Sequence, residues 1–144
     1  MHRFLSSFFM LSLLAGPIFS VQAETRHYPL EIYDVLDDHR LVIFLRGEDI
    51  AASPQWLPGE GAPPLTVAEA IARMRRQIEQ DVRLKGAKFY EIELKPIHKH
   101  DQENRWYYLL QFRTHGKHKP KAHYFAVLLS GKVVPAIEEP ASIK

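Results

Sequence analysis

The segment from Thr66 to Arg83, TVAEAIARMRRQIEQDVR, constrains the fold of this chain most, because its helix signals agree at both ends. Thr66 and Glu69 have the spacing of a capping box, in which a hydroxyl and a carboxylate accept hydrogen bonds from free amides of the first turn. A Pro-Pro pair before the segment prevents an earlier start, and Gly86 favours an end. Apolar residues recur at steps of three and four and form one stripe: Val67, Ala70, Ile71, Met74 and Ile78. The arginines of the segment are expected on its solvated surface.

Segments with the alternation of β-strands lie on both sides of this helix. They are residues 28–33, 41–46, 88–96, 106–113, 123–129 and 132–136. Because strand and helix alternate only once, the pattern predicts an α+β fold rather than a parallel sheet. We expect one amphipathic helix packed on an antiparallel sheet of about five strands, in the order strand, strand, loop, helix, then three or four strands. Pro135 and Pro140 predict a tail from about residue 137.

Alternation also predicts which side chains of the later strands are buried. Within residues 88–96, the apolar residues expected on the buried face are Tyr90, Ile92 and Leu94. Phe89 falls on the opposite, mostly wet face together with the glutamates. Residues 106–113, WYYLLQFR, form the most aromatic strand. We expect this strand near the centre of the sheet.

The first 23 residues, MHRFLSSFFMLSLLAGPIFSVQA, predict a secretory signal peptide. Arg3 gives a basic start, an apolar run follows, and Val21 and Ala23 are the small residues that precede a cleavage site. The apolar run is short for a membrane anchor. Cleavage after Ala23 would leave residues 24–144 as a single α+β domain. The chain has no cysteine, so it forms no disulfide, and we expect a bacterial periplasmic or secreted protein.

The charge balance argues against one class of partner. Only Arg3 is lost among the charged residues, so the mature chain has 18 Lys and Arg residues against 17 Asp and Glu residues. A net charge near +1 is not typical of nucleic-acid-binding proteins. The expected partner is therefore an envelope protein or peptide. No transmembrane anchor is expected after signal cleavage, and the oligomeric state stays open.

A Pro-rich connection occupies residues 48–65, EDIAASPQWLPGEGAPPL. Its four prolines exclude a regular strand, and a connection this long inside a compact domain is usually functional or disordered. Trp56 and Leu57 stand between two of the prolines. Either Trp56 folds back as a plug against the sheet or the helix end, or Trp56 and Leu57 form an exposed anchor for a partner protein.

Several segments together resemble the PepSY type of periplasmic domain: EAIARM, the break at Gly86, YEIEL, WYYLLQF and the hairpin AVLLSGKVV. The similarity covers residues 65–134, about half of the chain. Leu129 and Ser130 stand where that family has an acidic residue and a threonine before its last glycine. The resemblance implies a fold similar to the cystatin-like α+β arrangement. It also implies a non-enzymatic role in holding or inhibiting a peptidase or in sensing in the cell envelope, and it assigns no functional residue.

No catalytic motif occurs in this sequence, so we predict no catalytic residue, no cofactor and no enzymatic activity. Histidine is the one suggestive group. His98 and His100 lie two residues apart, and His115 and His118 belong to the basic loop of residues 114–121. If both loops lie at one end of the sheet, these imidazoles would suit zinc or copper. The interleaved lysines oppose a cation, which favours a solvated basic end facing anionic lipid, polysaccharide or an acidic partner.

The sequence thus predicts an exported, periplasmic binding protein for a partner protein or peptide, acting as an inhibitor or a sensor. The expected contact residues are Trp56 and Leu57 in the Pro-rich loop and Arg113, Lys117, Lys119 and Lys121 at the basic end. The alternative is a metal-binding or metal-sensing periplasmic protein whose ligands are His98, His100, His115 and His118.

Overall fold

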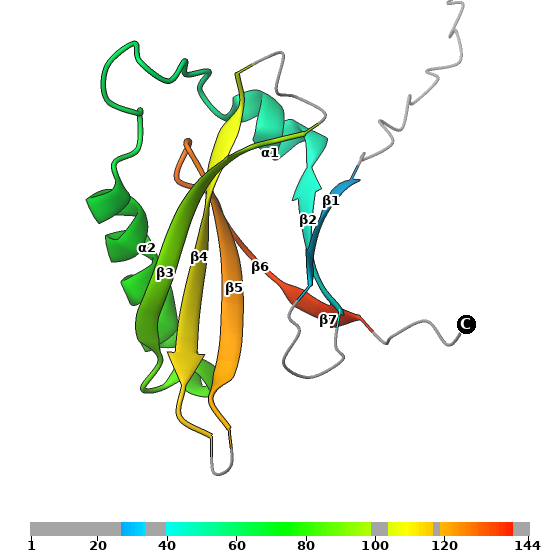
Figure 1. The fold of residues 1–144 in the computed structure, drawn as a ribbon, viewed down its shortest axis with the longest axis vertical. Coiled ribbons are helices and arrows are strands. Elements are labelled where there is room, and N and C mark those ends of the chain that lie inside the picture. Colours follow the sequence, from blue (N-terminus) through cyan, green and yellow to red (C-terminus); the bar gives the residue numbers. More distant parts are fainter. Residues whose placement is uncertain (1–26, 34–39, 99–103, 117–118, 140–144) are drawn as a thin grey trace, which may run out of the picture.

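The computed structural model describes residues 27–33, 40–98, 104–116 and 119–139 and shows an α+β fold (Figure 1). The described strands are β1 (His27–Tyr33), β2 (Arg40–Arg46), β3 (Lys88–Pro96), β4 (Trp106–Thr114), β5 (Lys121–Leu128), β6 (Val133–Pro135) and β7 (Ile137–Glu139). The helices are α1 (Gly47–Ala52) and α2 (Val67–Gln80), and a 3-10 turn follows at Val82–Leu84. The predicted α+β class is confirmed. The predicted signal peptide lies outside the described residues.

The strands form two antiparallel sheets, whereas the sequence predicted a single sheet of about five strands. The smaller sheet has the order β1-β2-β7 and the larger sheet the order β3-β4-β5-β6. Residues 133–139 join the two, because β6 pairs with β5 and β7 pairs with β2. Ala136 lies between β6 and β7 and donates its N–H to the carbonyl of Tyr124 at 2.9 Å. A strand that bends and changes sheets in this way forms the corner between two packed sheets.

The prediction of a tail from about residue 137 is wrong for residues 137–139. In β7, Ile137 lies opposite Val42 and Glu139 lies opposite Arg40. Pro135 was expected to end the pairing. It is tolerated because β6 is the edge strand of the larger sheet, where a missing N–H removes no bond to a further strand.

Helix α2 begins as the sequence predicts. Thr66 Oγ1 accepts a hydrogen bond from the amide of Glu69 at 3.2 Å, and the Glu69 carboxylate accepts one from the amide of Thr66 at 2.8 Å. The capping box is therefore confirmed. The helix ends at Gln80, earlier than predicted, because Asp81 is extended and leads into the 3-10 turn. Gly86 follows with a φ of 80°, which glycine adopts without steric cost.

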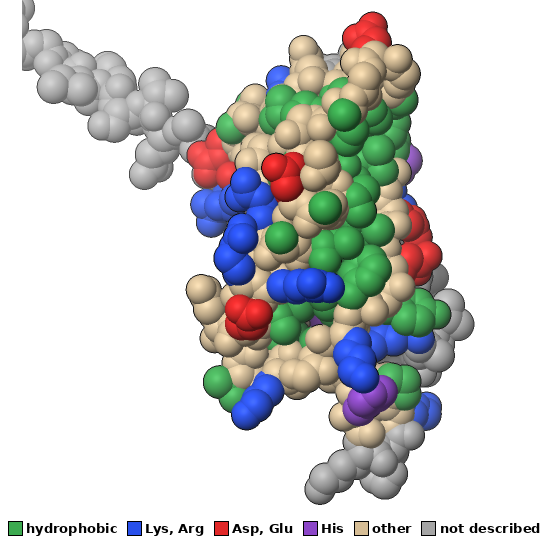
Figure 2. Space-filling view, turned by 90° about the vertical axis from the view of Figure 1, so that its left-hand side faces the viewer, with side chains coloured by type: hydrophobic (Ala, Val, Ile, Leu, Met, Phe, Trp, Pro, Cys, Tyr) green, Lys and Arg blue, Asp and Glu red, His purple; other side chains and the backbone are tan. Residues whose placement is uncertain are grey.

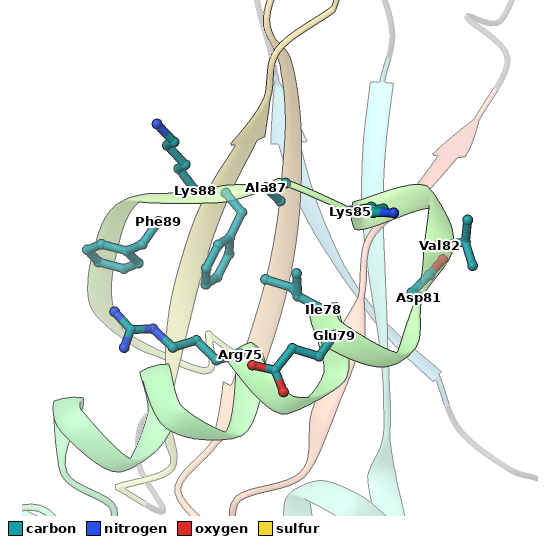
Figure 3. Close-up of a pocket in the computed structure, with 11 residues that line it drawn as sticks. Arg75, Ile78, Glu79, Asp81, Val82, Lys85, Ala87, Lys88 and Phe89 are labelled. Atoms are coloured by element: carbon teal, nitrogen blue, oxygen red, sulfur yellow. The ribbon is translucent and has the colours of Figure 1, made fainter.

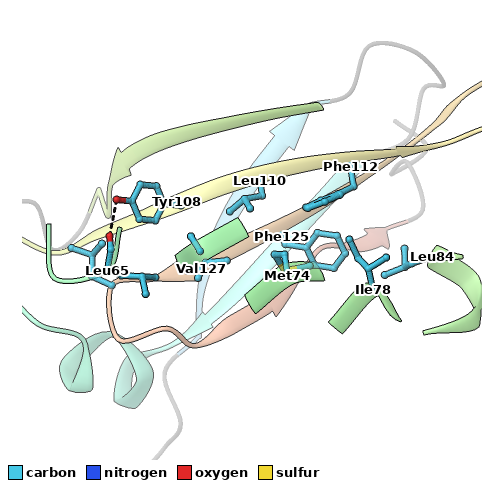
Figure 4. Close-up of a cluster of buried hydrophobic side chains, with 11 residues drawn as sticks. Leu65, Met74, Ile78, Leu84, Tyr108, Leu110, Phe112, Phe125 and Val127 are labelled. Carbon is cyan, nitrogen blue, oxygen red and sulfur yellow. Dashed lines mark hydrogen bonds between the residues drawn. The ribbon is translucent and has the colours of Figure 1, made fainter. Parts of the chain in front are cut away.

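The apolar stripe of α2 packs on one face of the larger sheet (Figure 4), except for Val67, which is 44% exposed. Met74 and Ile78 of the helix lie among side chains of β4 and β5 in this cluster. The buried members are Leu65, Ala70, Met74, Ile78, Leu84, Tyr108, Leu110, Phe112, Phe125, Val127 and Leu129. Tyr108 places its hydroxyl here as well, and it donates a 2.8 Å hydrogen bond to the carbonyl of Leu65. The one polar group of Tyr108 is thus satisfied inside an apolar layer.

A second apolar cluster lies on the opposite face of the larger sheet, toward the smaller sheet. Its buried members are Ile43, Leu45, Ile50, Ile97, Tyr107, Leu109, Ala126 and Leu128. The molecule therefore has three layers, with α2 on one side of the larger sheet and the smaller sheet on the other (Figure 1). Strand β4 is buried on both faces, as expected for the most aromatic strand, and its interior position in the sheet is confirmed.

A β-bulge in β3 changes the faces predicted for this strand. The pairing with β4 shifts at Tyr90, which is the additional residue of the bulge. Phe89 consequently lies opposite Phe112 on the α2 side and packs edge-on against it, with 5.7 Å between ring centroids. Ile92 and Leu94 lie on this same side, as predicted, and Ile92 packs against the cluster beneath α2. The predicted faces of Phe89 and Tyr90 are wrong, because an extra residue reverses the alternation at that point.

The Pro-rich connection is shorter than predicted, because α1 occupies residues 47–52. Ser53 after the helix is buried, and its Oγ accepts the N–H of Ser130 at 3.2 Å. The ammonium of Lys132 lies 3.8 Å from the carboxylate of Asp49. The connection is therefore attached at its start to the turn between β5 and β6.

Candidate functional site at the edge of strand β3

Strand β3 forms an exposed edge of the larger sheet. It is the terminal strand in the order β3-β4-β5-β6, and the described part of the chain places no strand beyond it. Most of its nine residues are exposed. They include three large apolar side chains, Phe89 at 38%, Tyr90 at 54% and Leu94 at 37% exposure. The backbone groups along such an edge are available for pairing with another extended chain.

A first hollow of about 740 Å³ lies between the end of α2 and the start of β3 (Figure 3). Its apolar lining residues are Ile78, Val82, Ala87, Phe89 and Phe112. Its charged lining residues are Arg75, Glu79, Asp81, Lys85 and Lys88. Figure 3 shows Arg75 reaching from α2 toward Phe89, while Asp81 and Val82 lie at the far end. The first hollow is thus an apolar depression whose rim carries both positive and negative charges.

One carboxylate of that rim is already engaged. Arg83 Nε donates to Asp81 Oδ1 at 3.0 Å, and Arg83 Nη2 donates to Asp81 Oδ2 at 2.7 Å. These side-chain bonds, with the backbone N–H of Arg83, lower the pKa of the Asp81 carboxyl from its ordinary value. A fork of two parallel bonds is the geometry in which guanidinium and carboxylate match best.

A second hollow of about 440 Å³ meets the first at Lys88 and Phe89, which line both. It lies against the connection from β4 to β5, and its remaining lining residues are Tyr90, Arg113, His115, Gly116, Lys119 and Pro120. The guanidinium of Arg113 lies over the ring of Tyr90, with 3.2 Å from Cζ to the ring centroid. Arg113 Nε is buried and has no hydrogen-bond partner among the described residues. The second hollow therefore combines aromatic surface with positive charge.

Charge is unevenly distributed along this side of the molecule. Figure 2 shows a long band of hydrophobic side chains on the α2 and β3 side, with lysine and arginine side chains along its left margin and near its lower end. Glu91 and Glu93 lie further along β3, and Glu93 is 2.7 Å from the ammonium of Lys95. Strand β3 therefore begins with the basic Lys88 and carries the carboxylates of Glu91 and Glu93 in its middle.

The structure brings together part of the predicted basic end. Arg113 and Lys119 both line the second hollow. Lys121 lies elsewhere, in a depression of about 560 Å³ between the two sheets, with its ammonium 4.0 Å from the carboxylate of Glu138. Lys117 lies outside the described residues.

Trp56 folds back onto the sheet. Its ring contacts that of Trp106 edge-on, with 5.8 Å between centroids, and its Nε1 donates to the carbonyl of Gly61 at 3.3 Å. Its backbone N–H donates to the carbonyl of Asn104 at 3.0 Å. This geometry matches the plug interpretation of Trp56. Leu57 is 41% exposed, and its role as a contact residue stays a prediction.

The structure separates two of the histidines that were expected to share a metal. His98 follows β3 and His115 follows β4, so the two lie at opposite ends of an antiparallel pair. Nine residues of extended strand separate these ends by about 30 Å. Among the described residues, no group of three or more His, Asp or Glu side chains is placed to hold a metal ion. The four-histidine site is therefore wrong; His100 and His118 themselves lie outside the described residues.

A hydroxyl and an imidazole meet across β4 and β5. Thr114 Oγ1 lies 3.1 Å from His123 Nε2. Burial lowers the pKa of His123, and the positive charges of Lys121 and Arg83 lower it further, while Asp81 acts in the opposite direction. The contact therefore involves a histidine that favours its neutral form, and it links the two strands.

The sequence did not predict three residues that are central to this site, namely Arg75, Lys88 and Phe89. The available signal was the pair of adjacent aromatic residues, Phe89 and Tyr90, at the start of an otherwise alternating strand. Adjacent aromatic residues in such a strand either point to opposite faces or mark an irregularity. Here they mark the bulge that separates the two hollows.

Comparisons with protein families, with curated proteins and with solved structures found no match. The resemblance to PepSY-type domains therefore stays a prediction. No helix in the described part of the chain has the length and apolar character needed to cross a membrane.

Proposed function

We propose that this protein is exported to the periplasm and binds a partner protein or peptide, which docks as an added strand on the edge of β3. The observation that supports this most is the nine-residue edge strand, exposed and without a described neighbour on its outer side. In strand addition, main-chain hydrogen bonds supply affinity and hollows for alternate side chains supply specificity. The first and second hollows lie beside this edge and share Phe89.

The apolar side chains along β3 indicate an edge that binds a partner rather than one built to prevent association. Natural edge strands are usually short, twisted away or lined with charge, because an exposed apolar edge promotes association. In β3 the exposed Leu94 and the half-buried Ile92 lie on the α2 side of the sheet. A partner strand would cover these side chains. The inhibitor-like or sensor-like role implied by the PepSY resemblance belongs to this proposal, as does the non-enzymatic mode of action.

The test begins with peptides selected from a displayed random library on the purified mature protein. We expect selected peptides to have alternating apolar residues and to slow amide hydrogen exchange along residues 88–96. Leu94→Asp is expected to weaken their binding tenfold or more, which corresponds to a loss of about 1.4 kcal/mol.

Leu57→Asp is the matched control, because Leu57 and Leu94 have similar exposures of 41% and 37%. This variant is expected to keep the affinity of the wild type. If Leu57→Asp abolishes binding while Leu94→Asp does not, the Pro-rich loop is the contact surface and docking on β3 is contradicted. A selection that enriches no peptide, or a mature protein that pairs with itself through β3, also contradicts the proposal.

A further inference from the structure

We propose that the second hollow is a carboxylate-binding subsite, which recognises an aspartate or glutamate side chain of the segment docked on β3. This inference rests on the proposed function, because strand addition is what brings a partner side chain to the start of β3. The exposed edge alone does not specify which side chains a partner carries, whereas a basic subsite selects for an acidic one.

The charge of the lining supports this assignment. The second hollow has the cationic residues Lys88, Arg113 and Lys119, with His115 beside them, and none of the described residues that line it carries a carboxylate. The first hollow differs, since Glu79 and Asp81 share its rim with basic residues. A partner carboxylate is therefore attracted to the second hollow more than to the first.

Arg113 is already arranged to receive a carboxylate. Its guanidinium lies over the ring of Tyr90, with Cζ 3.2 Å from the ring centroid, a contact that holds the group in place without using its N–H donors. The buried Nε has no hydrogen-bond partner among the described residues. Arg113 as a whole is only half-buried and lines the hollow. A carboxylate that enters the hollow can therefore meet the guanidinium, the group that pairs best with carboxylates.

The bulge at Tyr90 positions this subsite relative to the first hollow. Phe112 lines the first hollow and Arg113, the next residue of β4, lines the second. Neighbouring residues of a strand point to opposite faces of the sheet. A partner strand lying along β3 therefore presents consecutive side chains to the two hollows. The expected recognition pair is one apolar residue next to one acidic residue.

The test uses the same displayed library, selected on the wild type and on Arg113→Gln. The wild type is expected to enrich an acidic residue next to an apolar one, and Arg113→Gln is expected to enrich alternating apolar residues without the acid. The best wild-type peptide is then synthesised with an amidated C-terminus, and its acidic residue is replaced by the matching amide. This replacement should weaken binding to the wild type about tenfold and leave binding to Arg113→Gln within about twofold.

Arg113→Lys is the matched control, because lysine keeps the charge but lacks the flat fork of donors. It is expected to bind the acidic peptide between the wild type and Arg113→Gln. Should Arg113→Gln unfold at a markedly lower temperature than the wild type, Lys88→Gln replaces it, since Lys88 is exposed and lines the same hollow.

The outcomes separate this inference from the docking proposal. Enrichment of alternating apolar peptides without an acid overturns the carboxylate subsite and leaves docking on β3 intact. Binding that requires a free C-terminal carboxylate, and that ignores the acidic side chain, overturns it as well. Failure to enrich any peptide contradicts both.

Discussion

At the scale of single residues, Arg113 and His123 use their basic side chains in different ways. Arg113 stacks on Tyr90 beside an open hollow and keeps a donor without a described partner. His123 lies half-buried on β5 and meets the hydroxyl of Thr114. The Nε2 of His123 is engaged within the fold, so we expect His123 to affect stability rather than binding on β3.

His123 is therefore expected to make stability depend on pH. Burial lowers the pKa of this imidazole below its ordinary value of 6.5, and Lys121 and Arg83 act in the same direction against Asp81. The unfolded chain takes up this proton first as the pH falls, so the free energy of unfolding should decrease below about pH 6.5 and level off below the folded-state pKa. Urea unfolding at several pH values between about 4.5 and 8 measures this.

His123→Gln is the control, because glutamine is polar and does not titrate. Its free energy of unfolding should vary less than that of the wild type between pH 8 and pH 5. A wild type that gains stability relative to His123→Gln as the pH falls would contradict the assigned direction of the pKa shift.

At the scale of elements, α2 and β3 show how far local sequence determines local structure. The start of α2 follows from Thr66 and Glu69, whose hydrogen bonds span one turn and need no distant partner. The bulge of β3 depends on how Tyr90 and Phe89 fit against β4, in particular against Phe112. The alternation in the sequence therefore predicted the position of β3 correctly, but it predicted the wrong faces for Phe89 and Tyr90.

The cap of α2 gives a prediction at this scale. Thr66→Ala removes the acceptor for the amide of Glu69 and the hydroxyl that bonds its carboxylate at 2.8 Å. The free energy of unfolding should fall by about 1 kcal/mol, as for other N-cap replacements by alanine. Thr66→Ser keeps the hydroxyl and should remain within a few tenths of a kcal/mol of the wild type. Equal stability of the alanine and serine variants in urea unfolding would show that the box contributes nothing.

At the scale of the whole molecule, residues 133–139 hold the two sheets together. This short segment pairs with β5 through β6 and with β2 through β7, and it turns between them at Ala136. Helix α1 adds contacts at the other end of the interface, where Ser53 accepts from Ser130 and Asp49 faces Lys132. The smaller sheet thus depends on the C-terminal part of the described chain.

Truncation after Ala136 is therefore expected to expose β2. Without β7, the backbone of β2 loses its partner at Arg40, Leu41 and Val42, and its amides should exchange hydrogen faster, while β4 and β5 keep their protection. Hydrogen exchange measured by mass spectrometry resolves the two sheets. Truncation after Glu139 is the matched control and should leave β2 protected. Equal protection of β2 in both truncated chains would contradict the role of β7.

Much of the fold could be predicted from the sequence, because the signals involved act over a few residues. The capped helix, the strand segments and the central place of WYYLLQF each follow from spacing or composition within one segment. The distribution of strands over two sheets could not be predicted, because it depends on how residues 133–139 meet β2, nearly a hundred positions earlier. The four-histidine hypothesis failed for a related reason, since consecutive loops of an antiparallel meander lie at opposite ends.

The sequence by itself determined the capped helix α2 and the α+β class, since each rests on local hydrogen bonding, periodicity or composition. The export signal stays a prediction. Only the tertiary structure decided that the edge of β3 is exposed and that Phe89 and Arg113 line neighbouring hollows. Which residues are exposed, and which lie close together, depends on how distant segments pack against one another. The bulge at Tyr90 likewise depends on the pairing of β3 with β4. The candidate site therefore lies at the bulge of β3, where the alternation of side chains is interrupted.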